Sequence, residues 1–126
     1  MALRGGKACK RQLDKCSAAL PEVSQRPGGE KGHHVAYVVR KKTFAYFTED
    51  HHGDGRLTFL FRAPPGEQTA LIASEPDRFF VPPYVGHRGW VGMWLDTTDV
   101  AWSEVGEFMV EAYRMAAPKR LAALLT

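Results

Sequence analysis

The chain has 126 residues, of which 44% are hydrophobic and 11% aromatic, enough for one domain with a proper core. No apolar run approaches the roughly 18 residues of a membrane span, and the N-terminus lacks the apolar stretch of a secretory signal. We therefore expect one cytoplasmic domain over residues 1–126, with residues 1–6 as a flexible tail and no contact with a membrane.

The formal net charge of +3 is unevenly distributed along the chain. Residues 1–42 hold ten Lys and Arg against three acidic residues, whereas residues 43–117 hold five Arg against eleven acidic residues. A basic front and an acidic back can steer an anionic partner to one side of a protein. A solvated basic segment followed by charged helix surfaces accounts for the same pattern.

The first third of the chain predicts a helix, a loop and a strand. Apolar residues at helical spacing indicate an amphipathic helix over residues 7–20, which Pro21 ends. Cys9 and Cys16 would lie about 10 Å apart in it, beyond the ~7 Å reach of a disulfide, so we expect both to be reduced. Pro27 and nearby glycines make residues 24–34 a predicted loop, and residues 35–39 read as a strand.

Two further strands are expected over residues 43–48 and 57–62. Arg40, Lys41 and Lys42 would form the turn before the first of them, although such turns usually prefer Asn-Gly. In the strand over residues 57–62, apolar and polar side chains alternate, so we expect Phe59 to face the core and Thr58 to face solvent. Residues 50–55, which include Asp50 and Asp54, would be the loop between these strands.

The last half of the chain predicts a short helix over residues 66–74, a strand over residues 90–95 and a long helix. Alternation in that strand puts Trp90, Gly92 and Trp94 on one face. Asp99 is the expected N-cap of a helix over residues 100–116, whose apolar stripe follows helical spacing. The fold class is therefore α+β, an antiparallel sheet of about five strands in the order α-β-β-β-α-β-β-α, packed against the long C-terminal helix.

Catalytic and metal sites have little support in the sequence. The adjacent histidine pairs would point to opposite faces of an extended chain, and no CxxC, HxxxH or HExxH spacing occurs. No serine has the glycines of a nucleophile elbow, and His87 is the one residue that could be nominated as a base. We expect no enzyme activity, no cofactor and no metal.

Cationic and aromatic residues at predicted loop ends form the better candidate site. The cations are Arg40, Lys41 and Lys42 at one turn, Arg56 and Arg62 flanking a strand, and His87 and Arg88 between two glycines. Such side chains suit a phosphate backbone. Tyr84 and Trp90 could stack on bases, whereas we expect Trp94 and Trp102 to lie in the core.

Several short segments in their order resemble the MmcQ/YjbR family over about residues 13–117. They are Lys42-Thr43-Phe44-Ala45, Pro83-Tyr84-Val85-Gly86, Gly89-Trp90-Val91, Leu95-Asp96 and Glu111-Ala112-Tyr113. The resemblance implies a secretion-chaperone-like α+β domain that binds DNA through a double wing. The first wing would be the turn at Arg40 to Lys42, and the second the loop over residues 83–89.

Two functions are thus expected, in this order. The first is a non-enzymatic, monomeric DNA-binding domain that contacts phosphates through its wings. The alternative is a protein-interaction or small-ligand module that uses an aromatic groove around Tyr84, His87 and Trp90.

Overall fold

The computed structural model describes residues 5–28, 34–49, 55–97 and 100–125. The helices are α1 (Gly6–Ala18), α2 (Glu67–Ser74), α3 (Trp102–Ala116) and α4 (Lys119–Ala122), with 3-10 turns η3 (Gly86–Arg88) and η4 (Ala123–Leu125). The strands are β1 (Val23–Gly28), β2 (His34–Val39), β3 (Lys42–Glu49), β4 (Leu57–Phe61), β5 (Phe79–Phe80) and β6 (Val91–Trp94).

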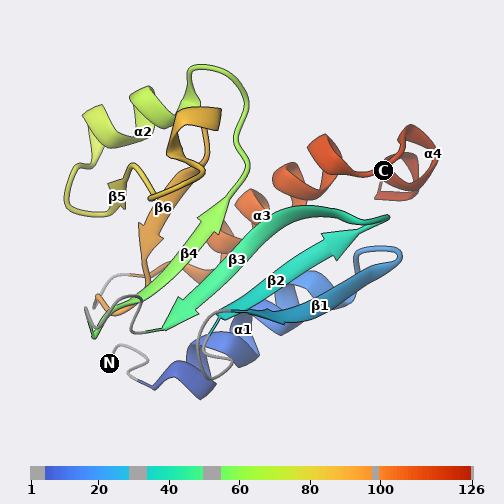
Figure 1. Cartoon of the computed structure of the whole chain (residues 1–126), viewed down its shortest axis with the longest axis horizontal. Helices are drawn as coiled ribbons and strands as arrows, with labels where there is room; N and C mark the ends of the chain where they lie inside the picture. The colour runs from blue at the N-terminus through green and yellow to red at the C-terminus, as the bar shows by residue number, and fades with distance from the viewer. Residues whose placement is uncertain (1–4, 29–33, 50–54, 98–99, 126) are drawn as a thin grey trace.

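One antiparallel sheet of six strands, in the order β1-β2-β3-β4-β6-β5, organises the described part of the chain (Figure 1). Helices α1 and α3 contact each other and cover one face of this sheet. The predicted α+β class and the packing of the long C-terminal helix are confirmed, with one strand more than expected.

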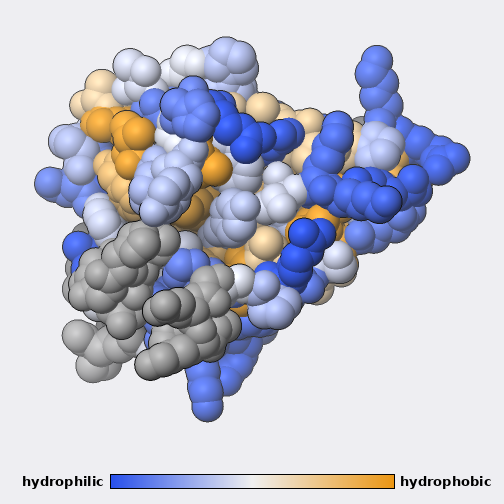
Figure 2. All heavy atoms as spheres, viewed as in Figure 1, coloured by the Kyte–Doolittle hydropathy of each residue, from blue (hydrophilic) through white to orange (hydrophobic). Residues whose placement is uncertain are grey.

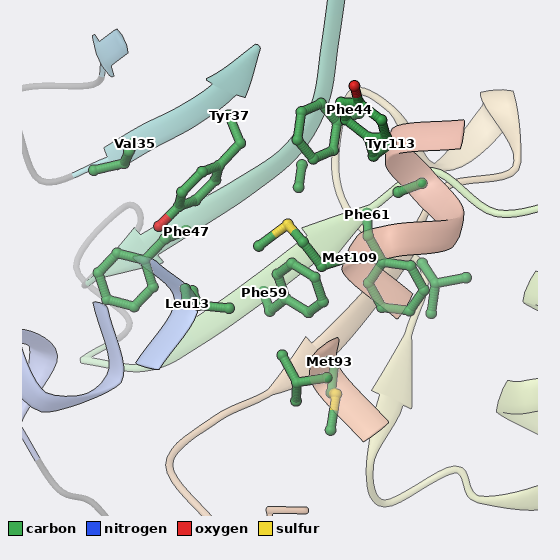
Figure 3. Packing of buried hydrophobic residues seen from close by; sticks show 14 of the residues in the cluster. Leu13, Val35, Tyr37, Phe44, Phe47, Phe59, Phe61, Met93, Met109 and Tyr113 are labelled. Carbon is green, nitrogen blue, oxygen red and sulfur yellow. The ribbon is translucent and has the colours of Figure 1, made fainter. Parts of the chain in front are cut away.

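The core lies between α3, α1 and the covered face of the sheet (Figure 3). The predicted stripe of α3 supplies Val105, Met109, Ala112, Tyr113 and Ala116, all buried. Strand alternation sends Phe59 and Phe61 into the same layer, where their rings stack at 4.9 Å. Burial of this apolar surface is the main favourable term in folding.

Strand β1 corrects the predicted loop over residues 24–34. Its six residues pair along their whole length with β2, from Val23 opposite Val39 to Gly28 opposite His34. Four of the six are exposed because β1 is an edge strand, although Val23 packs against the core. Pro27 is tolerated there, since an edge strand can leave one backbone position without a donor.

Other expectations also change with the structure. Thr58 is 4% exposed, not solvent-facing, because β4 is buried on both faces. The described start of α3 has Ala101 as its N-cap, and Asp99 lies outside the described residues, as do Asp50 and Asp54. Helix α1 already begins at Gly6, and both cysteines are free, as predicted.

The turn between β2 and β3 has two residues rather than the three cations expected. Val39 pairs with Lys42, and the residues between them, Arg40 and Lys41, have φ of 47° and 69°. Positive φ at both central positions is the mark of a type I′ turn, whose twist matches that of the strands. Lys42 is therefore already part of β3.

None of the helices formed by the described residues is long and apolar enough to cross a bilayer.

Candidate functional site

Two of the cationic segments predicted as wings leave the sheet at the same end. Because the strands are antiparallel, the β2–β3 turn, the last residue of β4 and the first residue of β6 all lie at the same end of the strands. We call this end of the sheet the cationic end. It carries Arg40, Lys41, Lys42, Arg62, His87 and Arg88.

The lysines of the turn are exposed, whereas its arginine is engaged. Neither Lys41 nor Lys42 makes an ion pair with a described residue. Arg40 instead donates from Nε and Nη2 to the carboxylate of Glu22, at 2.6 and 3.0 Å. This hydrogen-bonded guanidinium lowers the pKa of the Glu22 carboxyl. The guanidinium of Arg40 is thus engaged with Glu22, so Lys41 and Lys42 are the cations of this turn that can bind an anion.

Helix α4 adds cations that the sequence interpretation left out. The charge of Arg120 also acts on the Glu22 carboxyl, so α4 lies near the β2–β3 turn. Lys119 and Arg120 are both exposed. Figure 2 shows hydrophilic side chains projecting at the right, where Figure 1 places this turn and α4. Their charge is evident in the sequence, but nothing there links them to residues eighty positions earlier.

Trp90 is enclosed, so the expectation that it stacks on bases does not hold. It is 3% exposed. Tyr46 lies 5.6 Å from it, and the guanidinium carbons of Arg62 and Arg88 lie 6.0 and 5.9 Å from its ring centroid. Gln68 of α2 donates to the Trp90 carbonyl at 2.6 Å. Trp94 and Trp102, expected in the core, are each half-buried, and Trp102 packs against the core cluster.

Arg56 lies at the opposite end of the sheet and is held in a stack with Trp94. Its guanidinium carbon is 3.9 Å from the Trp94 centroid, and the ring of Phe80 is 4.2 Å from Trp94. Phe80 pairs with Gly92, two residues before Trp94, whereas Arg56 binds Asp96, two residues after it. At 3.9 and 4.2 Å from the ring centroid the two groups cannot share one face, so they cover opposite faces of the indole. Arg56 is not part of the cationic end.

Asp96 fastens this stack to the start of β4. It accepts two hydrogen bonds from Arg56, at 2.7 and 2.8 Å, and one from the Leu57 backbone N–H at 3.0 Å. These bonds, with that from Arg56 the strongest, hold the pKa of the Asp96 carboxyl below its ordinary value. A carboxyl whose pKa is lowered in the folded state contributes stability above its unfolded pKa, near 3.9.

The variant Asp96→Asn is expected to lose about 1–2 kcal/mol of unfolding free energy at pH 7, because it loses its charge toward Arg56. That difference should shrink as the pH falls through the lowered pKa of Asp96, since the parent carboxyl is then protonated too. Urea unfolding at pH 7, 4 and 2.5 measures it. Glu107→Gln, an exposed carboxylate on α3, is the matched control. An Asp96→Asn difference that does not change with pH would contradict this role.

A pocket of about 450 Å³ lies on the face of the sheet opposite α1 and α3, which we call the open face. Its floor is formed by Tyr46 and Thr48 of β3 and by Thr58 and Leu60 of β4. The rings of Phe80 and Trp94 form one wall, and residues 83–85 form the rim. Of the predicted aromatic groove, Tyr84 lines this pocket and His87 and Trp90 do not.

Gly92 makes room for the aromatic wall. A Cβ atom on Gly92 would fall on the ring of Phe80, well inside contact distance. Without that atom, Phe80 lies over the strand and stacks on Trp94, with an angle of 25° between the rings. The glycine in the sequence Val91-Gly92-Met93 therefore serves the close approach of a ring to the backbone.

Tyr84 is held in a strained turn at the rim. Its φ is 67°, and the Val85 N–H donates to the Pro83 carbonyl at 2.7 Å across it. A hydrogen bond between residues two apart, around a central residue with positive φ, defines the rare γ-turn. The side chain of Tyr84 is 74% exposed, the largest value among the large hydrophobic residues described. Strain of this kind is concentrated at functional sites.

Among the described residues no group of three His, Cys, Asp or Glu side chains is placed to hold a metal ion. His87, the nominated base, is an exposed residue of η3 and lies outside the pocket.

Comparison with known proteins agrees with the fold. A protein-family model described as YjbR matches residues 18–115. The crystal structure of the Deinococcus radiodurans protein DR2400, with the family-model domain DUF419, is similar with a TM-score of 0.67 at 19% identity. The similarity covers 82% of this chain and 74% of that one. A search of curated proteins gave no significant match.

Proposed function

Since the chain belongs to the YjbR family, and since several exposed cations from separate segments lie at one end of its sheet, we propose that it is a DNA-binding domain. The contacts are made by two wings, the β2–β3 turn with Lys41 and Lys42, and the segment around η3 with His87 and Arg88. The observation that carries this proposal is the antiparallel topology, which puts both segments at the cationic end.

The chemistry of these side chains favours phosphates over bases. The turn supplies ammonium groups, which meet phosphates as point charges. Arg40, whose fork could read a guanine edge, is occupied by Glu22. Trp90 is buried and cannot stack on an unpaired base. We therefore expect binding with little sequence preference and a steep dependence on salt.

Fluorescence anisotropy of a labelled random-sequence duplex at 50 and 200 mM salt tests the proposal. With three phosphate contacts, affinity should fall about 40-fold between these concentrations. The double variant Lys41→Ala, Lys42→Ala should weaken binding to all sequences alike and lower the salt slope by about 1 for each lost contact.

The matched control is Lys7→Ala with Arg11→Ala, two exposed cations of α1. It changes the net charge by the same amount away from the cationic end, so its affinity should stay close to that of the parent. Equal losses in both double variants would mean that only net charge matters. No binding at either salt concentration would refute the proposal.

A further inference from the structure

The pocket on the open face has the size and walls of a small-molecule site. Its volume of about 450 Å³ falls in the usual range for such pockets. Its described lining comes from β2, β3, β4, β5, β6 and the rim, so a rigid sheet holds most of it in place. The indole of Trp94 is fixed from both sides by Phe80 and Arg56. A flat molecule would meet preformed aromatic walls without having to order them.

The charge of the lining selects against ions. The described residues that line the pocket include no lysine, arginine, aspartate or glutamate. Arg56, which lies behind Trp94, is neutralised by the two oxygens of Asp96. Among the described lining residues only His34 could carry a positive charge, so a phosphate or carboxylate in the pocket would lose water without meeting a lysine or arginine, which is costly. The described lining therefore favours an uncharged occupant over a nucleotide.

Two hydroxyls give the floor its polar character. Thr48 and Thr58 are 5% and 4% exposed, lie opposite each other in the sheet, and share a hydrogen bond between their Oγ1 atoms. One hydroxyl donates to the other, so the accepting one keeps its own hydrogen for a further partner. Buried polar groups of this kind fix the orientation of a ligand in an otherwise apolar site.

The rim holds an exposed aromatic ring on a strained backbone. The γ-turn at Tyr84 carries a strained φ of 67°, yet the ring it presents is 74% exposed and adds little to the core. Contact between the exposed ring and a ligand would offset the free energy that the strained backbone costs.

We propose that this pocket binds a small, flat, uncharged molecule, whose ring system lies between Tyr84 and the Phe80–Trp94 wall and whose polar edge meets the hydroxyls of Thr48 and Thr58. None of the cations of the cationic end lines this pocket, although residues 83–85 of its rim precede η3 in the same loop, and the site does not depend on binding of DNA. It assigns a function to Tyr84 and to the close approach at Gly92.

Two matched fluorescent probes test the site on the full chain. N-phenyl-1-naphthylamine is uncharged, and 8-anilino-1-naphthalenesulfonate has the same ring system with one added sulfonate. The uncharged probe should bind with a stoichiometry of one, and about tenfold more tightly than the sulfonate, because the described lining holds no lysine or arginine to compensate the negative charge. Tighter binding of the sulfonate would overturn the assignment of an uncharged ligand.

The variant Tyr84→Gly separates binding from folding. Glycine adopts the positive φ without strain, so the thermal midpoint should stay equal or rise, while the uncharged probe should bind about fivefold or more weakly. Leu124→Ala, which removes another exposed apolar side chain, should bind as the parent does. Unchanged affinity in Tyr84→Gly would refute the site. Displacement of the probe by a single-stranded oligonucleotide would also refute it. Dimerisation of the protein without the probe, reversed when the probe binds, would show instead that a second copy of the chain covers the pocket and would refute the site as well.

Discussion

Replacing Tyr113 by alanine is expected to lower the free energy of unfolding by about 3–5 kcal/mol, the usual range for removing a large buried aromatic side chain. Tyr113 is fully buried on α3 and meets the ring of Phe44 edge-on, with centroids 5.7 Å apart. Its hydroxyl donates to the Pro21 carbonyl at 2.9 Å, which ties α3 to the segment that leads into β1. One side chain therefore joins the helix, the sheet centre and the sheet edge.

Two control variants divide this effect into its parts. Tyr113→Phe keeps the ring and loses only the hydrogen bond to Pro21, so it should cost about 1 kcal/mol. Met115→Ala, at an exposed position of the same helix, should change stability by less than about 0.5 kcal/mol. Urea unfolding of the three variants measures all of these values. Equal losses in the alanine and phenylalanine variants of Tyr113 would contradict the packing role of its ring.

The elements with a strong period were predictable from the sequence. The stripe of α3 repeats at three and four residues without interruption, and five of its six positions are fully buried. In the strand around Phe59, alternation identified the face that packs in the core, but not the burial of Thr58 on the other face. In these segments the side chains that pack the core also carry the pattern, so local sequence and tertiary structure agree.

Strand β1 could not be predicted from the pattern of its own residues. Its sequence contains Pro27 and Gly28, and four of its residues are exposed, so neither composition nor alternation marks a strand. It forms because β2 offers an unpaired edge, and the pairing runs over six residue pairs. An edge strand is stabilised mainly by its neighbour's backbone groups, which a single-sequence pattern does not record.

For a similar reason, only part of the candidate site could be predicted from the sequence. The two cationic segments were identified, but the pairing of Arg40 with Glu22 and of Arg56 with Asp96 joins residues 18 and 40 positions apart. The pocket needs the topology even more, because Thr48, Thr58 and Trp94 become neighbours only when β3, β4 and β6 pair. Burial of Trp90 likewise follows from Gln68 and Tyr46, which the sequence does not place beside it.

Cys9 should be labelled by iodoacetamide at pH 8 at least about 200-fold more slowly in the folded protein than in the unfolded chain, where the thiol pKa is about 8.5. Burial, with smaller contributions from the charges of Asp96 and Glu49, raises its pKa to about 11. Its side chain is inaccessible, with Sγ 4.0 Å from the Leu95 carbonyl oxygen. The thiolate that attacks the reagent is therefore scarce, and the reagent reaches it only when the core opens.

The measurement uses Cys16→Ser, in which Cys9 is the one remaining thiol, and follows the mass of the protein with time. The reciprocal variant Cys9→Ser reports on Cys16, which is half-buried on the same helix, and whose pKa is also raised by burial. Cys16 should be labelled faster than Cys9 in the folded protein, whereas in guanidinium the two rates should be similar. Labelling of folded Cys9 within about tenfold of the unfolded rate would mean that α1 leaves the sheet readily, because exchange through rare opening of a stable core is far slower.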